Sequence, residues 1–142
     1  MAKNNIIFKK IWQDSELMEL ETICSSGVIT AISKIYVSVS LLDELIFQIK
    51  SFLEGHITEG AWANENKGND STACVTFRFL KKNKLGHIWI EVFMELDDGG
   101  DYSKHNCCFY IDTEIGLLAN FCDDLTKLKG NFTEIEVQLN KD

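Results

Sequence analysis

HIWIEVFMEL, residues 87–96, alternates aliphatic residues with aromatic and acidic ones along its length. A repeat of two residues is the period of a β-strand, in which successive side chains point to opposite faces of a sheet. The pattern therefore predicts a central strand of an antiparallel sheet, buried on one face. The aliphatic face carries Ile88, Ile90, Val92, Met94 and Leu96, and the other face carries Trp89, Glu91, Phe93 and Glu95.

The flanking segments predict further strands of the same sheet. Residues 72–80 alternate in the same way, and the basic loop 81–86 joins them to this strand as a hairpin. On the other side, a turn at 97–101 leads to a strand at 106–111. Further apolar or alternating stretches lie at 6–12, 18–24, 28–37 and 132–139. The count of strands is about six or seven.

Two amphipathic helices are predicted between these strands. Leucine, isoleucine and phenylalanine recur every three or four residues over 41–53 and 117–128, which places them on one side of a helix. Ser40 and Asp43 resemble a capping box at the start of the first helix. The expected fold is one α+β domain, residues 1–142, with an antiparallel β-sheet of about six to seven strands and two amphipathic helices packed on one face.

Trp62 lies in the longest polar connection of the chain, residues 55–72. An exposed tryptophan on a loop can anchor a binding partner, but its large apolar ring more often folds back onto the core. We expect Trp62 to cover the edge of the core.

The net charge of −8 comes from the C-terminal part of the chain. Residues 1–85 hold ten acidic and ten basic residues, whereas residues 86–142 hold twelve acidic residues and four lysines. Arg78 is the only arginine. Surfaces that bind nucleic acids rely on clusters of arginine and lysine, so we do not expect this chain to bind DNA or RNA. The acidic excess either attracts a basic protein partner or serves only solubility.

The chain is expected to be cytoplasmic. Its longest stretch without a charged residue, residues 22–33, is too short to cross a hydrocarbon core about 30 Å thick. The first ten residues contain three lysines but no long apolar run and no small-residue cleavage site. We therefore predict neither a membrane span nor export.

The cysteines and histidines do not form a recognisable site. The five cysteines show no paired C-x-x-C spacing and lie mostly in apolar segments, which is typical of small core residues. His105 and Cys107 would share a strand face, but a zinc ion needs four ligands, and His56 and His87 are distant in sequence. We predict no catalytic residue, no metal and no cofactor.

The aromatic and acidic face of residues 87–96 is the best candidate for a binding surface. Its aromatic side chains would be anchors that lose water on binding, and its acids would set orientation and association rate. The predicted partner-binding residues are Trp89, Glu91, Phe93, Glu95, Asp97, Asp98 and Asp101. The alternative is that a helix or the N-terminal segment covers the aromatic residues and leaves only the acids exposed.

The order of the elements resembles that of one class of bacterial proteins. It runs from strands that include Ile11-Trp12-Gln13-Asp14 through a helix at 41–53, strands at 77–79 and 88–92, a helix at 117–128 and the closing Glu136-Val137-Gln138-Leu139. This layout resembles small bacterial immunity proteins encoded beside polymorphic and contact-dependent toxins, including those paired with neisserial Maf-type toxins. The resemblance implies a cytoplasmic protein without catalytic residues that binds and blocks one cognate toxin domain, often a basic nuclease.

The expected function is neutralisation of a cognate protein toxin through an acidic surface, with no nucleic-acid or membrane partner. One alternative is a small-ligand or metal-dependent enzyme with a pocket between helices and sheet near His87, His105 and Cys107. Another is a structural subunit that forms a homodimer through its aromatic and acidic face. Metal content tests the first alternative, and mass in solution tests the second.

Overall fold

The computed structural model describes residues 4–64, 74–81, 83–96 and 105–141. The chain forms strands and two α-helices, the second of which continues into a short 3₁₀ helix. In order these are β1 (Asn4–Gln13), β2 (Leu17–Ser26), β3 (Thr30–Ser38), α1 (Val39–Leu53), β4 (Gly60–Ala63), β5 (Cys74–Lys81), β6 (His87–Leu96), β7 (His105–Glu114), α2 (Ile115–Leu125), η1 (Thr126–Lys129) and β8 (Glu136–Gln138).

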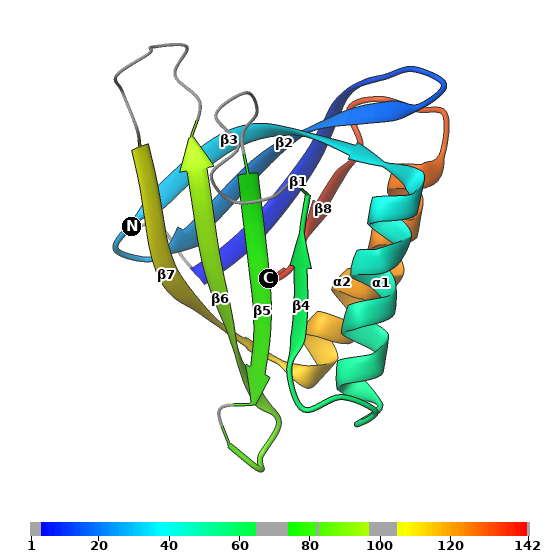
Figure 1. Ribbon diagram of the computed structural model, residues 1–142. Coiled ribbons are helices and arrows are strands. Elements are labelled where there is room, and N and C mark those ends of the chain that lie inside the picture. Colours follow the sequence, from blue (N-terminus) through cyan, green and yellow to red (C-terminus); the bar gives the residue numbers. More distant parts are fainter. Residues whose placement is uncertain (1–3, 65–73, 82, 97–104, 142) are drawn as a thin grey trace.

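The described strands form two antiparallel sheets of four strands each. The first sheet has the order β3-β2-β1-β8 and the second the order β4-β5-β6-β7 (Figure 1). The ring of Phe8 on β1 meets the ring of Phe77 on β5 edge-on, with centroids 6.1 Å apart, so the two inner faces bury each other. The prediction of a single sheet of six to seven strands was wrong because alternation shows that one face is buried but does not show what covers it.

The helices close one edge of this sandwich and do not cover an outer sheet face. Figure 1 shows α1 and α2 side by side along the edge formed by β4 and β8. Phe52 of α1 packs against Phe79 of β5, and Phe121 of α2 stacks on Phe8 of β1, with ring centroids 6.3 and 6.0 Å apart. The predicted packing on one face is corrected accordingly, since the buried side of each helix packs against the core at this edge.

The start of α1 differs from the predicted capping box at Ser40. The Oγ atom of Ser38 accepts a hydrogen bond from the backbone N–H of Leu41 at 3.1 Å, and α1 begins at Val39. Ser38 has the extended backbone that an N-cap requires, with φ −83° and ψ 164°, because it is also the last residue of β3. The strand therefore passes directly into the helix.

Trp62 folds back onto the core, as expected. It is 5% exposed, its ring stacks on Phe77 with centroids 5.8 Å apart, and its Nε1 atom donates to the carbonyl of Leu41 at 2.8 Å. It lies on β4, a strand that sequence analysis missed because Gly-Ala-Trp-Ala is poor in strand-forming residues. A Cβ atom at Gly60 would lie 3.0 Å from the Phe79 ring, so a larger residue here would have to displace that ring.

A buried lysine joins the first sheet to the end of the second helix. Lys10 on β1 is fully buried, and its Nζ atom donates to the carbonyls of Leu128 and Gly130 at 2.9 and 2.6 Å and to the Oε1 atom of Gln13 at 2.6 Å. Burial lowers the pKa of this amino group. A cation at the end of a helix satisfies carbonyls that have no partner within the helix. Lys10 thus holds the segment that leads into β8.

Candidate protein-binding face

The described members of the predicted binding set lie on the outer face of the second sheet. Trp89, Glu91, Phe93 and Glu95 alternate along β6, the strand between β5 and β7, and each side chain is partly exposed. No helix of the described ranges covers this face (Figure 1). Part of the burial of Trp89 comes from the neighbouring strand β7, whose Tyr110 ring meets it edge-on.

Glu91 is the centre of a connected group on this face. Its cross-strand neighbours are Arg78 on β5 and Tyr110 on β7. Its Oε2 atom lies 3.1 Å from Nη2 of Arg78 and accepts a hydrogen bond from the hydroxyl of Tyr110 at 2.7 Å. The Tyr110 ring meets Trp89 edge-on, with centroids 5.2 Å apart. We call these four residues, Arg78, Trp89, Glu91 and Tyr110, the Glu91 cluster.

The hydrogen bond within the cluster changes the acidity of the tyrosine. The carboxylate of Glu91 raises the pKa of Tyr110, because it accepts a hydrogen bond from the neutral phenol and because a second negative charge beside it is unfavourable. Tyr110 is therefore a neutral donor to Glu91 at physiological pH. Arg78 also lies 4.0 Å from Glu59, so one arginine serves two carboxylates.

The described part of this face carries several carboxylates. Alternation and register place five carboxylates on or beside it and one arginine, Arg78. The carboxylates are Glu59, Glu91, Glu95, Asp112 and Glu114. The predicted residues Asp97, Asp98 and Asp101 lie outside the described residues. Most of the negative charge here is peripheral, because the central carboxylate is paired with Arg78.

Other C-terminal acids lie elsewhere and pair with lysines. Asp124 on α2 is 3.1 Å from Lys127, and Glu134 is 3.3 Å from Lys9 on the first sheet. The acids of residues 86–142 that the structure describes therefore do not gather on one side of the molecule. Among the described residues, the acidic C-terminal part of the sequence does not form a single surface.

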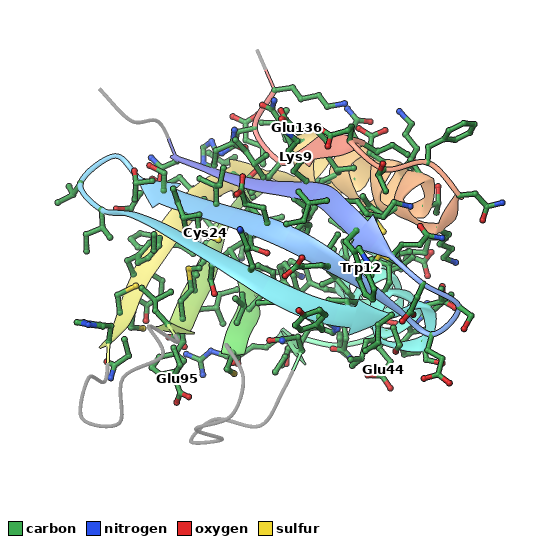
Figure 2. The ribbon with its side chains drawn as sticks, turned by 90° about the horizontal axis from the view of Figure 1, so that it is seen from above. Lys9, Trp12, Cys24, Glu44, Glu95 and Glu136 are labelled. Carbon is green, nitrogen blue, oxygen red and sulfur yellow. The ribbon has the colours of Figure 1, made fainter. Side chains whose placement is uncertain are left out.

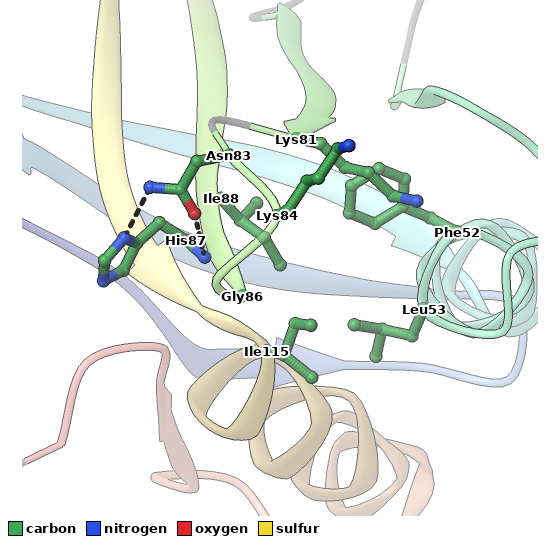
Figure 3. A pocket seen from close by; sticks show the side chains of 9 residues that line it. All are labelled: Phe52, Leu53, Lys81, Asn83, Lys84, Gly86, His87, Ile88 and Ile115. Atoms are coloured by element: carbon green, nitrogen blue, oxygen red, sulfur yellow. Dashed lines mark hydrogen bonds between the residues drawn. The ribbon is translucent and has the colours of Figure 1, made fainter.

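A cavity of about 400 Å³ lies at the end of the β5–β6 hairpin (Figure 3). Figure 3 shows Lys81 and Lys84 on one side of it and Ile115 on the other, and Nδ1 of His87 lies 2.8 Å from Nδ2 of Asn83. The remaining lining is mostly apolar, as in many ligand pockets.

The residues of the enzyme alternative are not brought together at this cavity. His87 pairs with Glu114, whereas His105 pairs with Leu96 at the opposite end of β7. Nine steps along a strand at about 3.3 Å per residue separate the two histidines by about 30 Å. Among the described residues, no group of three or more His, Cys, Asp or Glu could hold a metal ion.

The cysteines divide into buried and surface positions. Cys24, Cys74 and Cys122 are buried, as predicted, whereas Cys108 is exposed on the outer side of β7. Burial raises the pKa of the Cys24 and Cys122 thiols, which keeps them protonated at neutral pH. Protonated thiols are poor nucleophiles, so these buried cysteines are packing residues.

Sequence analysis missed Arg78 and Tyr110 as parts of the binding face. The sequence did contain a signal for both positions. Arg78 lies between the buried Phe77 and Phe79, and Tyr110 follows the buried Phe109. Alternation places both on an outer face, but only the strand register places them beside Glu91.

No protein-family model and no curated protein sequence matches this chain. Among solved structures, a chain of the CdiA-CT/CdiI toxin and immunity complex from Enterobacter cloacae matches at 9% sequence identity and a TM-score of 0.48. The match covers 85% of this chain and 97% of that chain. Neither of the described helices has the length and apolar character needed to span a membrane.

Proposed function

We propose that this protein is an immunity protein that binds and neutralises a cognate protein toxin through the outer face of its second sheet. The observation that carries the proposal is the Glu91 cluster, which places Trp89, Tyr110 and Arg78 together on a sheet face that no described helix covers. Tryptophan, tyrosine and arginine are the residues that most often dominate protein-binding energies. The order of elements, which resembles that of immunity proteins, supports the same class.

The charge of the face favours a basic partner, such as a nuclease domain. Five carboxylates and one arginine lie on or beside the described part of this face, so the surface would attract cations and speed encounter with them. A nuclease cleft is cationic because it binds phosphates, and carboxylates can occupy the same cleft. Trp89 and Phe93 would be the anchors, and Asp97, Asp98 and Asp101, which follow β6 directly, would extend the acidic rim.

The test is binding to the toxin domain encoded beside the gene for this protein. Co-expression should rescue cells from the toxin, and the purified pair should form a stable complex. Replacing Glu95 and Asp112 together with lysine should slow association at least tenfold and flatten its dependence on salt. A matched double variant, Glu16→Lys with Glu44→Lys, makes the same charge change away from this face and should leave binding unchanged.

Two results contradict the proposal. One is a toxin that neither binds the protein nor is blocked by it. The other is an equal loss of binding in the two double variants. This would show that net charge matters and that the position of the charges on the outer face of the second sheet does not.

A further inference from the structure

The first sheet also has an outer face, and its side chains form rows that cross the strands in register. The isoleucine row consists of Ile32 on β3, Ile23 on β2 and Ile7 on β1. The aromatic row consists of Tyr36 on β3, Glu19 on β2 and Trp12 on β1. Between them, the charged row consists of Lys34 on β3, Glu21 on β2, Lys9 on β1 and Glu136 on β8.

The apolar members of these rows are unusually exposed for a monomer. Ile32 is 56% exposed, Tyr36 47% and Trp12 44%. The rings of Trp12 and Tyr36 are held edge-on with centroids 6.4 Å apart, which fixes an aromatic pair at the surface. Apolar side chains gathered on one sheet face indicate an interaction surface.

The charged row has alternating signs, so its four charges sum to zero, and Glu134, 3.3 Å from Lys9, adds one negative charge beside it. Across the sheet its order is lysine, glutamate, lysine, glutamate. Figure 2 shows Lys9 and Glu136 as neighbours on the first sheet, and Glu95 lies away from them on the side of the second sheet. Such a row does not favour a strongly cationic or anionic partner, in contrast to the face of Glu91.

The row is complementary to itself under one two-fold rotation. An axis parallel to the strands, passing between β1 and β2, places β1 over β2 and β3 over β8 of a second copy. Glu21 then faces Lys9, and Lys34 faces Glu136, so each charge of the row meets an opposite one. A two-fold axis along the row would instead place each charge against its own copy. The same rotation places Ile23 against Ile7, whereas Ile32 faces Gln138 and Glu19 faces Trp12.

We propose that the outer face of the first sheet binds a second copy of this chain and forms a symmetric homodimer. A two-fold interface uses the same surface on both subunits, as this pattern requires. The rows span five to six residues along the strands, and four strands about 4.8 Å apart then give a footprint of about 350 Å². At about 700 Å² for the two copies together, this interface is smaller than those of stable complexes, so we expect a weak dimer that dissociates on dilution.

This dimer differs from the homodimer considered in the sequence analysis, because it uses the opposite sheet. The aromatic and acidic face of β6 remains open in both copies, so each subunit can still bind a toxin. The inference is independent of the proposed function, since it depends only on the first sheet.

The test reverses the charge at each end of the row, one end in each variant. In Lys34→Glu, two glutamates face each other at both symmetric positions, and in Glu136→Lys two lysines do. Sedimentation equilibrium over a wide concentration range should show dimers for the native protein and at least tenfold weaker dimerisation for each variant. An equimolar mixture of the two variants should form a heterodimer with native affinity, because every facing pair is again opposite in charge.

The mixing experiment separates contact from damage, because a misfolded variant is not repaired by another one. Thermal unfolding of each variant alone should match the native protein within a few degrees, since both positions are exposed. The control Trp89→Ala, on the second sheet, should dimerise like the native protein. The inference is overturned by a native protein that stays monomeric, by single variants that dimerise normally, by a mixture that stays monomeric, or by loss of the dimer in the Trp89 control.

Discussion

The two outer faces of the sandwich distribute opposite charges in different ways. On the first sheet, lysines and glutamates alternate along a row from Lys34 to Glu136, so no point of the row has a strong net charge. On the second sheet, Arg78 and Tyr110 converge on one carboxylate, Glu91, and the remaining acids lie around it. A row of alternating signs matches its own copy, whereas an acidic rim around an aromatic centre matches a different, cationic molecule.

The two faces also differ in how the chain builds them. The second sheet is made of β4 to β7, which follow one another along the chain. The first sheet takes its edge strand β8 from the C-terminal end, and only three residue pairs join β8 to β1. The charged row therefore depends on whatever holds the C-terminal segment in place.

The largest predicted effect comes from removing the lysine that holds this segment. Lys10→Met keeps the volume but leaves the carbonyls of Leu128 and Gly130 without their donor. We expect the free energy of unfolding, measured with urea, to fall by about 3 kcal/mol, as for other buried polar groups deprived of a partner. Dimerisation should weaken as well, because Glu136 loses its support.

The neighbouring residue provides the control for this prediction. Lys9→Met removes the same charge from the same strand, but the side chain of Lys9 points outward to Glu134 at 3.3 Å. Its loss should cost less than about 1 kcal/mol. Equal losses from the two variants would show that the charge of β1 matters and that the buried hydrogen bonds of Lys10 do not.

The next largest effect separates the two faces by their aromatic residues. Trp89→Ala should weaken toxin binding by about 2 kcal/mol, or about thirtyfold, because a tryptophan at the centre of an interface is a typical hot spot. Trp12→Ala removes a tryptophan from the first face and should leave toxin binding unchanged. Titration calorimetry with the toxin measures both. A larger loss of affinity in Trp12→Ala than in Trp89→Ala would show that the toxin binds the first sheet.

The sequence predicted most strands and both helices, but not the number of sheets. Alternation over residues 87–96 and 72–80 is decisive for strand and face, because only a two-residue period separates buried from exposed side chains. The same alternation is found whether helices or a second sheet pack on the buried face. Nothing local in the sequence states that Phe8 meets Phe77, since that contact depends on the packing of the whole chain.

The candidate site was predicted in part for a similar reason. Trp89, Glu91, Phe93 and Glu95 share a face because they alternate within one strand. Arg78 and Tyr110 come from other strands, and a register slip of one residue would move both to the inner face. Local patterns thus predict which residues of one strand act together, and pairing between strands determines which cluster they join.

A smaller effect tests whether Glu91 is the centre of the second face. Because the carboxylate accepts a hydrogen bond from the hydroxyl of Tyr110 and raises its pKa, Glu91→Gln should lower this pKa toward the ordinary tyrosine range. NMR titration of the Tyr110 ring measures the change. Glu95→Gln removes the same charge from the same strand, away from Tyr110, and should have a smaller effect. Equal shifts would indicate a general field and no specific hydrogen bond.

The sign of the accompanying stability change follows from the direction of this shift. The folded protein holds the phenolic proton more tightly than the unfolded chain does. The resulting contribution to the free energy of unfolding is present below the ordinary tyrosine pKa, and it is lost as the pH rises through the raised pKa of Tyr110 in the folded protein. The variant Glu91→Gln should therefore lose less stability than the native protein between neutral and strongly alkaline pH.

The smallest effect concerns the end of the chain behind β8. Asp124 on α2 lies 2.5 Å from Lys141 and 3.1 Å from Lys127, and these contacts, the Lys141 hydrogen bond first, lower the pKa of its carboxyl group. A lowered folded-state pKa stabilises the protein above the ordinary aspartate pKa, and this contribution is lost as the pH falls through the lowered one. Asp124→Asn should therefore cost less than about 1 kcal/mol at neutral pH and nothing in strong acid.

The matched variant for this carboxylate is its neighbour. Asp123→Asn removes the same charge one position earlier, where the side chain is exposed, and should have a still smaller effect at every pH. Urea unfolding at several pH values measures both variants. A loss in Asp124→Asn as large as that in Lys10→Met would mean that the ion pair with Lys141 holds β8 on the first sheet as strongly as the buried lysine does. The charged row would then weaken in acid, and dimerisation would become dependent on pH while the face around Glu91 kept its structure.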